Sequence, residues 1–449
     1  MNPLVINSFS PKAEIEIHTK NGEVFTREVV NDAVSVYIVR GVDASAGQAI
    51  LTLLVNKDKR GRSWQDRVHP MDYIVIRAGN KYKSDGTLPI RFRGFVDSLV
   101  ESLAMPTVGG PLRRITLVAR DYVKLFMINN IQYLWTVMLG ASIQSYPGLG
   151  RNYGITSKVT GVGEIIEQIV DHVFNGTGEG NLHSFIPMFK NETGLTIPNI
   201  VLSNKIPSRF SAQDLTIQPY TGPLWSLINY LSSPPLGESF IYDGEDAPVL
   251  VCRPVPFKGI DGNIPSPGQP PELSTIKVDP SIVSGYTLGK TDAQTLNFFF
   301  VYCDAGANNG SSAPVYASTA LELGENFNPY LSSSYTTNPY WNHKSANTYG
   351  LKPLNISTPW VELPSSKTDS AQKNAVELAD FLGKIFDHNQ DLMGGQITAH
   401  GDENLIHGRY IQFGDAEYYL EQVEDKISFV GDQNPSWSTV LSVTRGQGI

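Results

Sequence analysis

The chain carries one strand pattern twice, once near each end. In the first copy, residues 91–99 are followed by a turn-rich gap and then by 114–121; in the second, 418–427 are followed by a gap and then by 439–446. Three pairs of residues align between the copies: Val96 with Val423, Asp97 with Glu424 and Arg120 with Arg445. A repeated supersecondary unit constrains the architecture more than any single residue does. We therefore expect two copies of one sheet module. As a trimer, such a chain presents six quasi-equivalent modules in a ring, which indicates a structural adaptor rather than an enzyme.

Length and composition favour a β-rich chain of several domains. At 449 residues the chain exceeds one ordinary hydrophobic core, and two to four domains are expected. An apolar fraction of 41% with 18% charged residues is typical of a folded protein, and 40 Gly and 29 Pro indicate many turns.

The charge balance argues against nucleic acid binding as the main role. The chain has 35 Lys and Arg against 44 Asp and Glu, a net charge of -9, so phosphate binding through counterion release is not favoured. An acidic surface repels nucleic acid, which suits a channel through which DNA slides without sticking.

Cysteine usage and the N-terminal residues indicate a reducing compartment, and the longest apolar run does not indicate a membrane span. The two cysteines, Cys252 and Cys303, are too few for a disulfide framework and are interpreted as reduced core residues. The N-terminus lacks the basic start and apolar core of a signal peptide, so we expect synthesis and retention in a cytoplasm. Residues 125–143 are interrupted by amide side chains, so they are interpreted as a buried or partner-facing segment and not as a membrane span.

Patterning along the chain predicts an α+β, β-dominated fold with two β-barrel or sandwich modules and a mixed α/β middle region. The first module opens with a hairpin whose strands flank Asn21-Gly22. Further strands are expected at 34–39, 49–55, 73–77, 90–96, 114–119, 239–242, 249–253 and 298–303. Helices are expected at 162–174, 223–231 and 371–386.

These elements divide the chain into five parts. They are an N-terminal β domain at 1–125, a partly helical, mixed domain at 126–232, the first part of a second β domain at 233–303, an Asn/Ser/Tyr-rich insertion at 304–366, and a helix with the closing strands of the second β domain at 367–449.

Motifs that suggest chemistry are incomplete. Residues 285–291 approach a phosphate-binding loop, but three residues separate the glycines where four are needed, so a turn between strands is expected. Glu164, Glu167, Asp171 and His172 share a helix face that is interpreted as solvated. His388, His400 and His407 lack zinc-site spacing, and no Gly-x-Ser-x-Gly elbow is present. We assign no catalytic, metal or cofactor residues, although a carboxylate pair without a sequence signature stays open.

The Asn/Ser/Tyr-rich stretch holds rigid aromatic residues among small polar ones, a composition typical of contact surfaces. A protein partner is the leading interpretation; stacking on a sugar ring and a loop that covers its own domain are the alternatives. The expected contact residues are Tyr330, Tyr335, Tyr340, Trp341 and Tyr349.

Several segments resemble phage tail baseplate hub proteins. Residues 50–56, 64–76 and 92–97 resemble the N-terminal tail-tube-like domain of that family, and 418–423 with 439–446 resemble its closing strands. Residues 237–240 with 253–257 are similar to its middle region. The resemblance covers most of the chain except about 126–200 and 304–364, and no lysozyme or peptidase module is appended.

The resemblance implies that both β modules, at 1–125 and within 233–449, are tail-tube-like, and that the chain forms a homotrimer in the virion tail (baseplate), assembled in the host cytoplasm. Its six modules would cap the six-fold tail tube and hand over to a three-fold spike or fibre, with DNA passing through the lumen during ejection without specific binding. The implied partners are the tail tube protein, a spike or tip protein, other baseplate proteins and the tape measure protein. A tail-associated protein that binds or cleaves glycans is the alternative.

Overall fold

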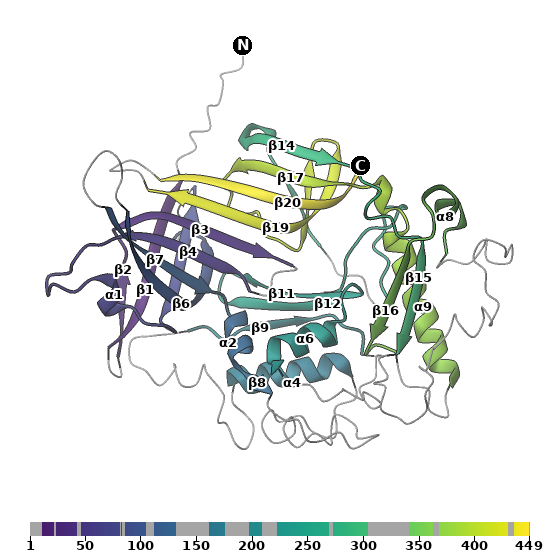
Figure 1. The fold of residues 1–449 in the computed structure, drawn as a ribbon, viewed down its shortest axis with the longest axis horizontal. Helices are drawn as coiled ribbons and strands as arrows, with labels where there is room; N and C mark the ends of the chain where they lie inside the picture. Colours follow the sequence, from purple (N-terminus) through teal and green to yellow (C-terminus); the bar gives the residue numbers. More distant parts are fainter. Residues whose placement is uncertain are drawn as a thin grey trace, which may run out of the picture.

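The computed structural model describes residues 11–21, 24–42, 46–80, 82, 86–104, 112–131, 161–175, 197–208, 222–268, 273–303, 341–361, 368–429 and 435–448. They form an N-terminal β module, a C-terminal β module and a mixed α/β body beside both (Figure 1). The fold is β-dominated and of the α+β class, as the sequence predicts.

The N-terminal module is built from seven strands and one short helix of the described region. They are β1 (Lys12–Asn21), β2 (Val24–Val29), β3 (Ala33–Gly41), β4 (Gln48–Leu54), α1 (Trp64–Arg67), β5 (Tyr73–Gly79), β6 (Ile90–Ala104) and β7 (Leu112–Arg120). Every strand expected in this part of the sequence is present, including the opening hairpin. Alternate residues point inward, as the period of two requires, and β1 and β5 share one apolar core with β3 and β4.

The C-terminal module is assembled from segments that lie far apart in the sequence. Its strands are β13 (Thr275–Lys277), β14 (Val283–Gly289), β17 (Met393–His400), β18 (Arg409–Phe413), β19 (Ala416–Ser428) and β20 (Ser436–Gly448). Its core lies on the inner face of these strands. The turn expected at 285–291 is wrong, because most of that segment is β14, which pairs with β17.

The two hairpins that carry the repeat, β6–β7 and β19–β20, have the same register. Phe95 lies opposite Arg120 in the first and Tyr419 opposite Thr444 in the second. One pair further along, each hairpin has a bulge, at Asp97 in the first and between Leu420 and Gln422 in the second. The repeat is therefore present in three dimensions.

The residue alignment expected between the copies is wrong. The shared bulge places Asp97 level with Glu421 and not with Glu424, and places Arg120 level with Thr444 and not with Arg445. Similar letters in two amphipathic strands do not fix a register, because shifted alignments match apolar positions almost equally well.

The match between modules extends to the neighbouring strands. β4 pairs with β7 as β17 pairs with β20, and β3 pairs with β4 as β14 pairs with β17. The last two pairings share a bulge, one between Ala33 and Ser35 and the other between Val283 and Gly285. β5 also pairs with β6 as β18 pairs with β19. Four matched positions are buried in both modules: Val96 and Leu420, Leu117 and Leu441, Leu51 and Ile397, and Ile74 and Ile411.

Both modules belong to one open sheet. Thirteen of the described strands join it, and its main path runs from β14 at one end to β2 at the other without returning to itself. The barrel alternative is therefore not met among these strands.

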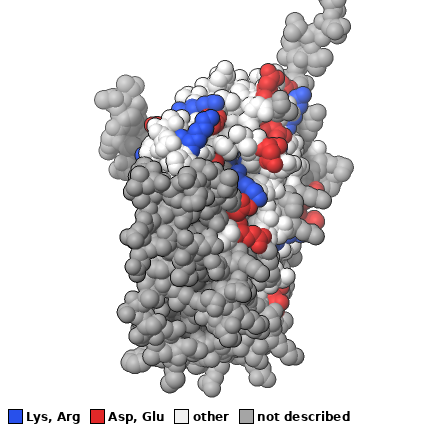
Figure 2. Space-filling view, turned by 90° about the vertical axis from the view of Figure 1, so that its right-hand side faces the viewer, with Lys and Arg blue, Asp and Glu red and all other residues white. Residues whose placement is uncertain are grey.

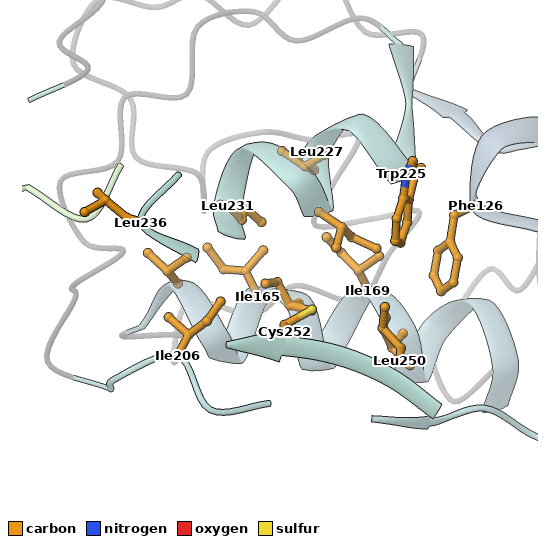
Figure 3. Packing of buried hydrophobic residues seen from close by; sticks show 14 of the residues in the cluster. Phe126, Ile165, Ile169, Ile206, Trp225, Leu227, Leu231, Leu236, Leu250 and Cys252 are labelled. Atoms are coloured by element: carbon orange, nitrogen blue, oxygen red, sulfur yellow. The ribbon is translucent and has the colours of Figure 1, made fainter. Parts of the chain in front are cut away.

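The mixed body has its own sheet and helices. Its first part comprises α2 (Val123–Ile128), β8 (Asn130–Ile131), α4 (Val162–Asn175), β9 (Val201–Asn204), β10 (Gly222–Pro223), α6 (Leu224–Ser232), β11 (Gly237–Asp243) and β12 (Pro248–Pro254). The helices α4 and α6 are close to their expected bounds. Figure 3 shows Ile165 and Ile169 of α4 and Leu227 and Leu231 of α6 around Cys252 of β12. Cys252 is buried and unpaired, as expected.

Two of the expected domain boundaries differ from the structure. Residues 237–254 do not begin the second β module, because β12 pairs in parallel with β9 and so completes the sheet of the mixed body. The expected insertion at 304–366 contains α8 (His343–Tyr349) and β16 (Pro353–Thr358), and β16 pairs with β15 (Phe298–Cys303). The helix α9 (Thr368–Phe386) packs on β15 and shares the core of the mixed body, not that of the closing strands. None of the described helices is long and apolar enough to cross a bilayer.

A close backbone approach at Gly94 gives a test of the β6–β7 register. A Cβ at this position would lie 2.1 Å from the carbonyl oxygen of Arg120, so Gly94→Ala should cost about 3 kcal/mol or more, the upper range for single substitutions. Urea unfolding measures the cost. At Gly448 the nearest atom to a Cβ is 4.0 Å away, and Gly448→Ala should leave the midpoint nearly unchanged; equal effects of the two changes would contradict the register.

Candidate assembly interface

The two β modules meet along one pair of antiparallel strands, β3 and β19. The seam runs from Ser35 opposite Ser428 to Gly41 opposite Gln422. Backbone hydrogen bonds extend the seam at both ends: Phe429 N donates to Val34 O, and Val42 N donates to Glu421 O, each at 2.9 Å. The pairing therefore converts two sheets from opposite ends of the chain into one.

A buried ion pair crosses this seam. Arg91 of β6 binds Asp425 of β19, with 2.7 Å between Nη2 and Oδ2, and both side chains are 1% exposed. The other carboxylate oxygen of Asp425 accepts from Trp437 Nε1 at 3.0 Å and from Thr439 Oγ1 at 2.6 Å. Burial raises the pKa of Asp425, but the charges of Arg91 and Arg40 and the hydrogen bonds outweigh it and hold the pKa below its ordinary value.

Arginines also tie the N-terminal module to the mixed body. Arg40 of β3 binds Asp243 of β11 at 3.1 Å, and both side chains are less than 5% exposed. Arg93 of β6 donates to the carbonyl oxygen of Glu245 at 2.8 Å. Since an unpaired buried charge is costly, these contacts favour one relative position of the two bodies.

The C-terminal module is held to the mixed body in the same way. Arg253 of β12 binds Glu238 at 2.7 Å and donates to the carbonyl oxygen of Gly408 at 2.6 Å. Tyr419 of β19 donates to Glu238 at 2.8 Å. Arg445 of β20 donates to Asn389 Oδ1 at 2.8 Å, just beyond α9. The three bodies thus form one unit held by buried arginines.

His407 lies inside this junction. Its Nε2 donates to the carbonyl oxygen of Ile241 at 3.1 Å. Burial, the largest cause, and the charges of Arg40, Arg91 and Arg253 lower the pKa of His407 to about 3, against the raising effect of the hydrogen bond. The ring is therefore neutral at physiological pH.

Two of the strand edges that remain open in the described region match the two strands of the seam. One is β14, which pairs with β17 on one side only, and the other is the second half of β6, beyond the stretch that pairs with β5. Both edges expose large apolar side chains: Tyr286 is 64% exposed, Val100 58% and Leu103 57%. Open apolar edges of this kind are sites for pairing with another strand.

The expected aromatic contact residues are only partly accounted for. Tyr330, Tyr335 and Tyr340 lie outside the described residues. Trp341 is 3% exposed and its ring packs against Phe298, so it belongs to the interior and does not form part of an exposed surface. Tyr349 is 40% exposed, and its role as a contact stays a prediction.

Sequence reasoning missed the buried arginine contacts. A signal for one of them was present, because Asp425 lies between Val423 and Ile427 in the inward phase of its strand. A charge at an inward position implies a buried partner, but the sequence does not say that the partner is Arg91, which lies at the other end of the chain.

The described surface shows no separate chemical centre. No group of three His, Cys, Asp or Glu able to hold a metal occurs among the described residues. A pocket of about 610 Å³ lies between the C-terminal module and the end of α9, with Phe386 and Arg445 in its wall. Glu421 is the one carboxylate among its described lining residues, so a carboxylate pair is not assembled there. On the face seen in Figure 2, described basic and acidic side chains lie next to one another.

No protein-family model and no curated protein matches the chain. Similar solved structures are tail proteins and a PdpA-VgrG complex. The 43 kDa tail protein of prophage MuSo2 from Shewanella oneidensis is 13% identical, with a TM-score of 0.48, over 97% of this chain and 98% of that one. The tail protein from Neisseria meningitidis MC58 is 9% identical, with a TM-score of 0.44, over 97% of each chain. The Francisella PdpA-VgrG complex in its lidded form is 10% identical, with a TM-score of 0.41, over 98% of this chain and 53% of that one. At these identities and TM-scores the likeness assigns no function.

Removing Arg91 tests whether its ion pair with Asp425 helps to hold the two β modules together. Arg91→Met leaves the buried Asp425 carboxylate without its ion pair and should cost about 3–5 kcal/mol of stability. The matched control is Arg62→Met, which breaks a pair with Asp58 in which the arginine is 42% exposed, and should cost about 1 kcal/mol or less. Urea unfolding compares the two, and similar midpoints would show that the Arg91 contact does not hold the modules together.

The neutral His407 predicts a pH dependence of stability. Its folded pKa lies below its unfolded value of 6.5, so the unfolded chain binds the extra proton, and this contribution is present above pH 6.5 and lost as the pH falls toward 3. The stability difference between wild type and His407→Gln should therefore shrink by about 2 kcal/mol between pH 7.5 and pH 5. Urea unfolding at both pH values measures it, with His400→Gln at an exposed site as control. A difference that is constant with pH would contradict the assignment.

Proposed function

We propose that this protein is the structural hub of a phage or phage-like tail baseplate. Three copies form a ring of six β modules that joins the six-fold tail tube to a three-fold spike or fibre and lines part of the DNA channel. The observation that carries the proposal is that one chain holds two matching modules already paired edge to edge through β3 and β19.

The duplication supports this role through symmetry. A chain with two equivalent modules presents six equivalent positions when three copies surround an axis, and closed rings are the usual outcome of identical subunits joined by one repeated contact. Such a chain can meet a six-fold partner on one face and a three-fold partner on the other. The sequence resemblance to baseplate hub proteins supports the same assignment.

The rigidity of the chain supports a mechanical role. The buried contacts of Arg91, Arg40, Arg253 and Arg445 connect the three bodies at several independent places. A joint between a tube and a spike must transmit force without changing shape, and buried polar contacts that require specific partners favour one arrangement.

The charge of the chain suits the passage of DNA. With a net charge of -9, the ring repels the phosphate backbone on average and binds it weakly. The glycan-cleaving alternative has less support. The large pocket holds the single carboxylate Glu421, and in the neighbouring pocket the second carboxylate, Glu238, is buried and bound by Arg253 and Tyr419, whereas glycoside hydrolysis generally requires two carboxyl groups that flank the substrate bond.

The oligomeric state tests the proposal directly. The purified chain should have a mass three times the 49.3 kDa of one chain, and negative-stain images should show a ring with six lobes and a central bore. Light scattering coupled to size exclusion gives the mass. A chain that stays monomeric at micromolar concentration, or a compact assembly without a bore, would argue against the hub.

A further inference from the structure

The repeat leaves two strand edges without the partner that their counterparts have. β3 is covered by β19 on the side away from β4, whereas its counterpart β14 has no partner among the described strands on the side away from β17. The second half of β19 is covered by β3, whereas the corresponding half of β6 has no described neighbour on that side. The two open edges therefore correspond to the two strands that form the β3–β19 seam.

We propose that β14 of one copy pairs, antiparallel, with the second half of β6 of the next copy, in the register of the β3–β19 seam. This inference rests on the proposed ring of identical copies and specifies how the ring closes. The shared bulges fix which residues meet. The expected pairs between copies are Val100 with Gly289, Glu101 with Leu288, Ser102 with Thr287, and Leu103 with Tyr286.

These pairs follow from the seam that the structure already contains. Glu424 lies opposite Val39, Asp425 opposite Ile38, Lys426 opposite Tyr37 and Ile427 opposite Val36. Because the two hairpins have the same register, residues 424–427 of β19 correspond to residues 100–103 of β6. Because β3 and β14 share a bulge, residues 36–39 of β3 correspond to residues 286–289 of β14. No adjustment of either strand is needed.

The side chains at the two edges are complementary. In the existing seam, Val36 and Ile427 are both fully buried in one core. Their counterparts Tyr286 and Leu103 are among the most exposed apolar residues of the described chain, at 64% and 57%. Tyr286 already lies 5.4 Å from the ring of Phe413. Leu103 of the next copy would extend this cluster and remove two exposed apolar side chains from water, which is favourable.

Charges at the proposed seam are complementary too. Glu101 occupies the strand position of Asp425, and Lys290 follows β14 at the position of Arg40. In the existing seam the charge of Arg40 favours the ionised form of Asp425. In the proposed register Glu101 lies opposite Leu288, so the acidic residue of one copy would be diagonal to the basic Lys290 of the next, which favours this register over a slipped one.

Another open edge of the sheet, β2, does not fit the same role. β2 ends the path of the sheet, and the C-terminal module has no counterpart of the β1–β2 hairpin in the described region. Its exposed apolar residue Val29, at 53%, therefore has no matching seam to copy. This makes β2 a suitable control edge.

Disulfide mapping tests the register. Backbone bonds from Phe429 N to Val34 O and from Val42 N to Glu421 O show that Lys426 and Tyr37 form a non-hydrogen-bonded pair. The corresponding pair is Ser102 and Thr287, and Cα atoms in such pairs are about 4.5 Å apart, within the range of a disulfide.

The double variant Ser102→Cys, Thr287→Cys should form covalent dimers and trimers under mild oxidation, seen on a non-reducing gel. Val100→Cys, Thr287→Cys places the cysteines two residues out of register and should cross-link at least roughly tenfold less, because Cα atoms beyond about 7 Å do not form a disulfide without backbone movement. The wild type, with its two native cysteines, and each single variant are the background controls.

A second variant keeps the proposal testable if cysteines disturb folding. Leu103→Lys places a charge in the proposed seam and should raise the concentration at which copies separate roughly tenfold or more, measured by light scattering. Val29→Lys on β2 should not change it. Equal effects of the two lysines, or efficient cross-linking of the slipped pair, would overturn the register.

The mass of the unmodified chain separates this inference from the proposed function. Three copies without the Ser102–Thr287 cross-link would overturn the β14–β6 pairing while leaving the trimeric hub intact. A monomeric mass would overturn both, since no neighbouring copy would exist to close the seam.

Discussion

The architecture depends on the backbone pairing of β3 with β19. This seam joins a strand near the start of the chain to one near its end, and it is the one strand pairing between the two β modules among the described residues. Without it, the second half of β19 and the outer side of β3 would be open apolar edges, like those of β6 and β14. The seam therefore stabilises one chain and at the same time shows how two equivalent modules fit together.

The buried arginines convert this pairing into one defined arrangement. Apolar contacts between sheets tolerate small slides, whereas a guanidinium buried among carbonyl and carboxylate oxygens requires its partners at specific positions. Arg91 acts at the seam, and Arg253 and Arg445 act where the mixed body meets the C-terminal module. The mixed body thus braces both modules from one side (Figure 1). This bracing is consistent with a protein whose proposed role is to hold other proteins in place.

Sequence reasoning succeeded where the signal is local. The opening hairpin, the strands of the first module and the helices α4, α6 and α9 follow from apolar periods that a short window contains. It failed where position depends on a distant partner. Residues 237–254 were expected in the second module, but the parallel pairing of β9 with β12 places them in the mixed body. Trp341, expected on a contact surface, lies buried against Phe298, because an aromatic residue has the same local pattern in a core as on a surface.

The sequence by itself determined that the chain is β-dominated, that a strand pattern recurs near its two ends, and that the balance of charge is acidic. Those properties depend on composition and on side-chain alternation along short segments. Only the tertiary structure decided the register of the two hairpins, the partner of Asp425 and the identity of the open edges. The physical reason is that strand pairing is made by backbone groups common to all residues, so the sequence restricts which strands can pair, while bulges and packing between distant segments select the pairs that form.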